Sequence, residues 1–148
     1  MTVQPVSPRM KQLFLVAVVL MFLHKVECGL AAEWRVSPFF QWLIGVFERS
    51  GDSTADALGA GMFLSFVTWL FLGLGMSLLV LRGGWGPHLA LAIWGLSFVL
   101  EWHHVLRAVS GGGYYPGVLT AVPYLAFGLP YWRELGGHVV RAPVVHPT

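Results

Sequence analysis

Histidine and glutamate side chains recur at helical spacing in two separate apolar stretches of the sequence. His24 stands three residues before Glu27, and Glu101 stands three residues before His104. Residues three apart are neighbours on a helix surface, so each stretch would place an imidazole beside a carboxylate. Such groups together bind Zn²⁺ or iron, and without a metal they form a pair that can move a proton. The spacing therefore indicates either metal or acid–base chemistry.

These groups belong to a chain with the composition of a membrane protein. Of its 148 residues, 56% are hydrophobic and only 11% are charged, whereas about 25% are charged in ordinary soluble domains. The long unbroken apolar runs predict helices, because the strands of a membrane barrel alternate apolar and polar side chains. We therefore expect an all-α integral membrane protein whose partner is the lipid bilayer. The net charge is only +2, without a dense basic cluster, so we expect no nucleic-acid partner.

The apolar pattern predicts a bundle of four transmembrane helices in a single domain, residues 1–132, followed by a short C-terminal tail, residues 133–148. The expected spans are residues 10–28, 57–81, 88–106 and 118–132. Residues 38–47 are apolar and aromatic but too few to cross a bilayer. We expect them to form an interfacial or re-entrant helix between spans one and two.

Alternating spans bring the C-terminal ends of the first and third helices to one face of the membrane. His24 and Glu27 would then lie level with Glu101 and His104. Ionisable groups inside a bilayer cost about 2.5 to 3.5 kcal/mol each when central, so a group of them indicates a function. Only one of the adjacent histidines can share a face with Glu101, and we favour His104 over His103. The predicted metal ligands are His24, Glu27, Glu101 and His104, with Glu27 and Glu101 also as catalytic carboxylates.

Further side chains at this face are candidates for a substrate pocket. They are Glu33, Trp102, His103, Tyr114 and Tyr115. Glu33 would fold back over the site if the first helix ends near Gly29. The alternative interpretation is that the aromatic residues form an interfacial belt and that the histidines and glutamates meet water at the headgroups. Lys25 is expected to extend its ammonium group toward the membrane surface.

Three motifs together resemble those of HXXEE-domain proteins, a family of small bacterial integral membrane proteins. They are His24-Lys-Val-Glu27, Glu101 with His104, and Tyr114-Tyr-Pro-Gly117, and the resemblance covers residues 13–132. It implies a membrane enzyme or a metal site without assigning a reaction. The chain departs from the family pattern at Cys28, which stands where the motif has its second glutamate. This departure favours a mononuclear site or an acid–base pair over a carboxylate-rich di-iron site.

Three functional hypotheses follow from these residues. The first is a membrane-embedded enzyme whose His/Glu site binds Zn or Fe and acts on a lipid-like or other apolar small molecule. The second is a metal-free isomerase that moves protons on a sterol-like or isoprenoid substrate, in a cavity walled by Trp102 and Tyr114. The third is non-catalytic: an accessory subunit, or a haem protein with His24 and His104 as axial ligands, haem being less favoured than Zn or Fe. A homodimer is compatible with all three.

The distribution of basic residues gives an expectation for orientation. With four spans, one face would hold Arg9, Lys11, Arg82, Arg133 and Arg141, and the other Lys25, Arg35, Arg49 and Arg107. The small excess on the first face predicts that both termini lie in the cytoplasm, in a bacterial inner membrane.

Overall fold

The computed structural model describes residues 5–49, 54–82 and 86–140, and almost all of them are helical. The elements are α1 (Pro8–Leu30), the 3₁₀ helix η1 (Glu33–Arg35), α2 (Pro38–Arg49), α3 (Thr54–Arg82), α4 (Gly86–Leu100), α5 (Trp102–Ser110) and α6 (Val118–Val140). The described residues include no strand, which confirms the all-α prediction.

Three helical stretches are long and apolar enough to cross a membrane: Pro8–Leu30, Gly61–Arg82 and Gly86–Ser110. They correspond to the first three expected spans. The expected fourth span lies in α6, which contains Pro123 and Pro130 and is not among these stretches. Many large apolar side chains on the three stretches face outward, as in Phe63 and Phe71 at 70% and 69% exposure. Exposed apolar surface of this kind is typical of a face that meets lipid or another protein.

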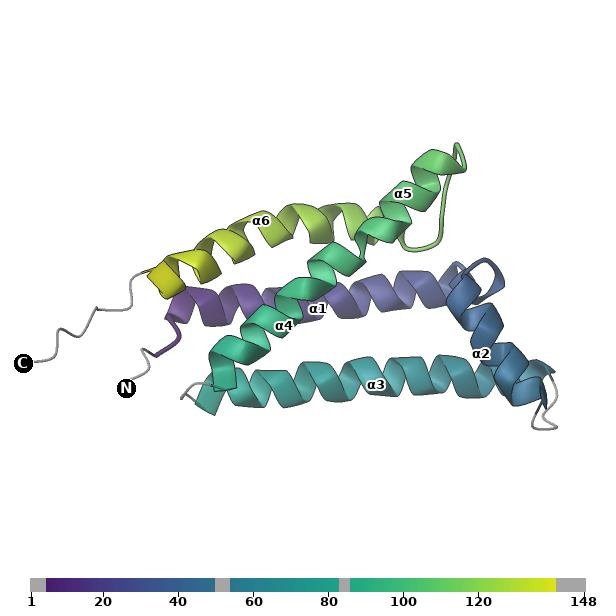
Figure 1. Ribbon diagram of the computed structural model, residues 1–148, viewed down its shortest axis with the longest axis horizontal. Coiled ribbons are helices and arrows are strands. Elements are labelled where there is room, and N and C mark those ends of the chain that lie inside the picture. The colour runs from purple at the N-terminus through teal and green to yellow at the C-terminus, as the bar shows by residue number, and fades with distance from the viewer. Residues whose placement is uncertain (1–4, 50–53, 83–85, 141–148) are drawn as a thin grey trace, which may run out of the picture.

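α1, α3 and α6 run lengthwise, and both ends of the described chain lie at the same end of the molecule (Figure 1). α1 packs against α3 and α6, while α4 crosses from α3 to α6. At the shared end, Glu134 of α6 accepts a hydrogen bond from Ser7 at 3.1 Å and pairs with Arg9 at 3.5 Å. The C-terminal end of α1 lies at the other end, beside α2 and α5. The polar motifs of the sequence are therefore gathered at one end.

The hydrophobic core lies between α1, α4 and α6. Phe14 of α1 meets Trp94 of α4 edge-on at 5.5 Å, and Phe98 of α4 stacks on Tyr124 of α6 at 4.4 Å between ring centroids. Offset and edge-on aromatic pairs add about 0.5 to 1.5 kcal/mol each beyond the area they bury. These contacts fix α4 against α1 and α6. They therefore also fix the position of its last residue along the bundle.

The prediction that the last helix ends at residue 132 and a tail follows is wrong for residues 133–140, because α6 continues to Val140. Tyr131 and Leu135, four residues apart on one helix face, are both buried, so the apolar stripe of α6 extends past the predicted end. The rest of the expected tail, residues 141–148, lies outside the described part of the chain.

The third expected span is interrupted. α4 ends at Leu100, α5 begins at Trp102, and Glu101 stands at the break with φ −73° and ψ −7°. The carbonyl of Glu101 accepts from the amide of His104 at 3.2 Å, a three-residue turn that is tighter than an α-helical one. The single helix predicted for residues 88–106 is therefore two helices, and the break carries one of the candidate site residues.

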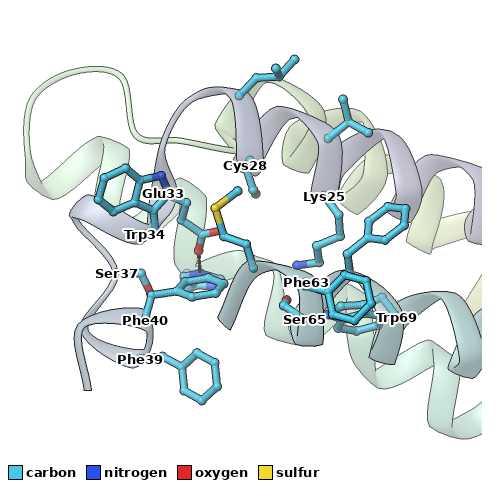
Figure 2. Close-up of a pocket in the computed structure, with 16 residues that line it drawn as sticks. Lys25, Cys28, Glu33, Trp34, Ser37, Phe39, Phe40, Phe63, Ser65 and Trp69 are labelled. Carbon is cyan, nitrogen blue, oxygen red and sulfur yellow. Dashed lines mark ion pairs between the residues drawn. The ribbon is translucent and has the colours of Figure 1, made fainter. Parts of the chain in front are cut away.

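α2 lies where the short helix was expected, at residues 38–47, and it packs against α3. Between α1, η1, α2 and α3 lies a cavity of about 700 Å³ (Figure 2). Its volume is within the range of about 300 to 1,000 Å³ that small-molecule sites occupy.

Candidate metal centre and adjoining cavity

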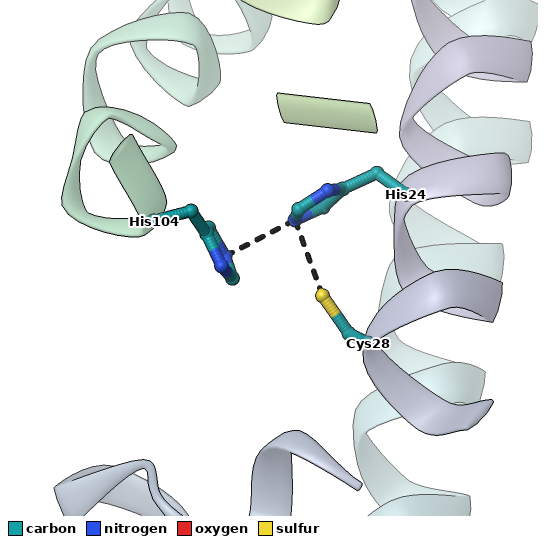
Figure 3. Close-up of side chains that lie close together, drawn as sticks. All are labelled: His24, Cys28 and His104. Atoms are coloured by element: carbon teal, nitrogen blue, oxygen red, sulfur yellow. Dashed lines mark hydrogen bonds between the residues drawn. The ribbon is translucent and has the colours of Figure 1, made fainter. Parts of the chain in front are cut away.

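Three of the four predicted metal ligands meet between α1 and α5. His24 and His104 have no exposed surface, and Glu101 is 3% exposed. The Glu101 Oε2 atom lies 2.8 Å from His24 Nε2 and 3.0 Å from His104 Nε2. The two Nε2 atoms are 3.2 Å apart (Figure 3). The structure thus brings together two segments that are 80 residues apart in the chain.

The outer nitrogen of each histidine is held by a hydrogen-bond acceptor. His104 Nδ1 lies 2.6 Å from the carbonyl oxygen of Pro116, which can only accept, so this nitrogen carries the hydrogen. His24 Nδ1 lies 2.9 Å from the hydroxyl of Thr120, which itself donates to Glu27, so His24 Nδ1 is also a donor. Each neutral ring then turns an unprotonated Nε2 inward. Metal-binding histidines commonly have their outer N–H held in this way.

The inner atoms of this cluster repel one another unless something positive lies among them. The Glu101 Oε2 atom is buried and has no hydrogen-bond partner of acceptable geometry in the described chain, although two nitrogens lie close to it. Burying such an oxygen without a partner is costly. A tetrahedral Zn²⁺ bonded at about 2.0 to 2.1 Å would hold its ligand atoms about 3.3 Å apart. The observed separations of 2.8 to 3.2 Å are close to that value.

Cys28 places a thiol beside the two histidines of this cluster. It follows His24 by one helical turn, is buried, and places its Sγ 3.4 Å from His24 Nε2. The donor atoms of His24, Cys28 and His104 all lie within 4.8 Å of one another (Figure 3). From the sequence, Cys28 is a possible soft ligand outside the four predicted ones, and the structure places it beside the cluster.

Glu27, predicted as a ligand and a catalytic carboxylate, does not reach the cluster. Its carboxylate instead accepts hydrogen bonds from the amides of Leu119 and Thr120 at 3.2 and 2.7 Å, and from the Tyr114 hydroxyl at 3.0 Å. The first amides of a helix have no partner within the helix and attract carboxylates. Glu27 therefore binds the start of α6 and touches His24 only through Thr120.

Lys25 differs from the expectation that its ammonium reaches the membrane surface. Its Nζ lies 3.2 Å from Glu101 Oε1 and 5.0 Å from the centre of the Trp69 ring. A buried carboxylate gives this ammonium a counter-charge that lipid does not. Lys25 therefore holds one oxygen of Glu101 and leaves the other facing the two histidines.

The segment before α6 closes over the cluster at Gly117. This residue has φ +88°, and a Cβ atom there would lie 2.6 Å from Cys28 Sγ and 2.7 Å from the His104 ring. Both the backbone angle and the close approach require glycine. The fixed segment also presents the Pro116 carbonyl to His104.

Two of the five predicted pocket residues, Glu33 and His103, line the adjoining cavity. Glu33 is buried, and its carboxylate lies 3.9 Å from His103 Nε2. Burial opposes the charged form of this carboxyl, but the neighbouring His103 imidazole and Cys28 thiol outweigh it and hold the pKa of Glu33 below its usual value. A carboxylate and an imidazole thus face the cavity together.

The other three predicted pocket residues do not line this cavity. Trp102 and Tyr114 are exposed, and the Tyr115 ring packs on His104 at 5.6 Å between centroids. The aromatic wall comes instead from Trp34, Phe39, Phe40, Phe63, Phe66 and Trp69. The prediction missed these residues because they lie on η1, α2 and α3, whose packing on α1 is not visible in the local sequence.

No family model, no curated protein and no solved structure matches this chain. The resemblance to HXXEE-domain proteins therefore stays a prediction from three short motifs, and the function has to be argued from the geometry of the cluster.

Proposed function

We propose that the protein is a membrane-embedded, metal-dependent enzyme that acts on a lipid-like or other apolar small molecule. His24, Glu101 and His104 hold the metal. The observation that carries this proposal is the buried Glu101 Oε2 atom, which lies 2.8 and 3.0 Å from two Nε2 atoms whose rings donate from their outer nitrogens. Among the described residues it has no hydrogen bond of acceptable geometry. Imidazole, carboxylate and thiol donors favour Zn²⁺, with iron as the second choice.

The residues around the cluster have different roles in this proposal. A metal held by three protein ligands keeps a position for water or substrate and supplies Lewis-acid chemistry. Lys25 offsets the charge of Glu101 through Oε1, and Thr120 and Pro116 fix the orientation of the two imidazoles. Cys28 lies between the cluster and the cavity, because it contacts His24 and also lines the cavity wall.

The proposal includes the membrane arrangement expected from the sequence. α6 forms a fourth span, supported by its packing on α1 and α4, and α2 lies at the interface as a short aromatic helix. Both termini are then on one side, and we propose the cytoplasmic side of a bacterial inner membrane. A homodimer fits the exposed apolar surface.

A metal-free proton-transfer enzyme is the second candidate, and one observation favours it. The Nε2 atoms of His24 and His104 are at hydrogen-bond distance, 3.2 Å, while both outer nitrogens are donors. A hydrogen bond between them requires one added proton on the pair, which Glu101 would stabilise. Such a proton could pass to a sterol-like or isoprenoid substrate.

The non-catalytic candidates have less support. Haem iron binds axial ligands on opposite sides of the macrocycle, whereas the two imidazoles meet edge to face with centroids 4.5 Å apart. An accessory subunit would use the cluster only to join α1 to α5, and no observation favours that use over catalysis.

Metal analysis tests the proposal directly. The full chain would be purified in mild detergent without a metal-affinity column, beside His24→Ala, His104→Ala and the control His88→Ala, which changes a histidine at the start of α4. We expect about one zinc or iron per chain in the wild type and in the control. We expect none in the two site variants. Metal retained in both site variants would overturn the proposal, and a metal-free wild type would favour the proton-transfer candidate.

A further inference from the structure

The cavity beside the cluster has two chemically different sides (Figure 2). Its polar side carries Lys25, Cys28, Glu33 and His103. Most of the rest is apolar, with Phe39, Phe40, Met62, Phe63, Phe66 and Trp69. Apolar walls with a few placed polar groups are typical of small-molecule sites. A lining of this kind suits an amphiphile better than a purely apolar molecule.

The ionisable groups on the polar side lie in two close pairs. Lys25 Nζ lies 3.2 Å from Glu101 Oε1, and His103 Nε2 lies 3.9 Å from Glu33 Oε1. A charged head group would therefore enter without an unpaired opposite charge among the described lining residues, and burying it would be costly. An ammonium has three donors, and the described chain pairs one of those of Lys25 with Glu101. The polar side thus favours a neutral head group that carries an oxygen acceptor.

The apolar side reaches the surface of the bundle. Phe39 and Phe63 are 59% and 70% exposed, and both line the cavity. Phe63 lies on α3 within one of the three membrane-length stretches. An acyl chain would pass between these rings into the bilayer, while the head group stays beside Lys25 and Cys28. Those two residues also contact Glu101 and His24, so the head group would lie next to the candidate metal centre.

We propose that the cavity binds a neutral single-chain lipid whose head group bears ester or hydroxyl oxygens, such as a monoacylglycerol. This inference rests on the proposed function in one respect, namely that this lipid is the substrate of the candidate metal centre. Binding itself can be tested apart from the metal.

The test uses a monoacylglycerol with a photoreactive diazirine in its acyl chain, added to the full chain in nanodiscs. Ser65→Trp would fill the cavity, because Ser65 of α3 lines it. Leu64→Trp is the matched control, since Leu64 is 51% exposed and does not line the cavity. We expect cross-linking to fall at least about tenfold in Ser65→Trp and to stay at the wild-type level in Leu64→Trp. Unlabelled monoolein should compete with the probe and oleate should not.

Two results would overturn the inference. One is equal labelling of the wild type and Ser65→Trp, and the other is competition by oleate as strong as that by monoolein. A second measurement does not depend on any variant: cross-linked wild-type peptides should map around Phe40 and Phe66, and labels confined to outward positions such as Leu78 would contradict the proposal.

Metal content measured on the same samples separates the two proposals. Specific lipid binding in a chain without metal would overturn the metal-dependent function and support the lipid site. Bound metal without specific lipid binding would overturn the lipid site and support the metal centre.

Discussion

At the scale of single residues, the two oxygens of Glu101 have different surroundings. Oε1 meets the ammonium of Lys25, and Oε2 faces the two imidazoles without a hydrogen bond. Removing one partner of a buried ion pair typically costs about 3 to 5 kcal/mol, because the other charge is left uncompensated. Lys25 therefore supplies a counter-charge to Glu101 through Oε1, and Oε2 stays directed at the two imidazoles. The different surroundings of the two oxygens depend on the direction of the side chains, which the spacing of residues does not reveal.

Thr120 is expected to support the cluster without being a ligand. Thr120→Val removes the hydroxyl that accepts from His24 Nδ1 and donates to Glu27, and it keeps the shape of the side chain. Loss of such an outer partner typically lowers metal affinity about 10- to 100-fold. Competition with a chelator of known affinity would measure the change.

Thr68→Val is the control for this prediction, because Thr68 is exposed on α3. We expect its metal affinity to equal that of the wild type. An unchanged affinity in Thr120→Val would mean that the outer hydrogen bond of His24 does not matter for the site.

At the scale of elements, the site depends on two irregular positions, a break between two helices and a turn just before a third. The break at Glu101 turns its side chain and that of His104 toward α1, while Trp102 and His103 are exposed. The turn at Gly117 brings the start of α6 against the same cluster. The regular helices set the level of the site, and these irregular positions set its geometry.

Gly117→Ala is expected to destabilise the protein by about 1 to 3 kcal/mol, because the residue combines a positive φ with a Cβ position occupied by other side chains. Chemical denaturation in detergent, or thermal unfolding followed by circular dichroism, would measure this loss.

Gly113→Ala is the matched control in the same segment, since a Cβ there meets nothing within 4 Å. A change within about 0.5 kcal/mol is typical of such a surface position. Equal effects of the two substitutions would contradict the close approach at Gly117.

The meeting of His24, Glu101 and His104 could be predicted because it needs only helical spacing and alternating spans. Their partners could not. Thr120 lies in the first turn of α6 and Pro116 just before it, where free amides also draw Glu27 away from the cluster. The helix break also escaped prediction, because the sequence around Glu101 contains no proline or glycine that would signal it.

At the scale of the whole molecule, the end that holds both ends of the described chain lies opposite the end that holds the cluster and the cavity. Ser7 and Arg9 meet Glu134 at one end, and the cluster and the cavity lie at the other. The element order was largely predictable from apolar runs, whereas the extension of α6 to Val140 depends on packing partners in α1 and α4.

Single-cysteine labelling tests the arrangement in the membrane. In a Cys28→Ala background, Arg9→Cys and Gly137→Cys should react with an impermeant maleimide from the same side of sealed vesicles, and Ser110→Cys from the opposite side. These positions are exposed near the two ends of the bundle. Reaction of Arg9→Cys and Gly137→Cys from opposite sides would rule out a fourth span in α6.

The separation of His24 from His104 along the chain also has a consequence for biogenesis. The ribosome makes His24 and Cys28 early, and His104 follows His24 by 80 residues. At a synthesis rate of about 5 to 20 residues per second, this delay lasts about 4 to 16 seconds. During that time α1 and α3 can already associate in the membrane, but the first half of the site has no partner. The cluster is complete only once α4 and α5 have also been made, so loading of the proposed metal would be a late step in the maturation of the protein.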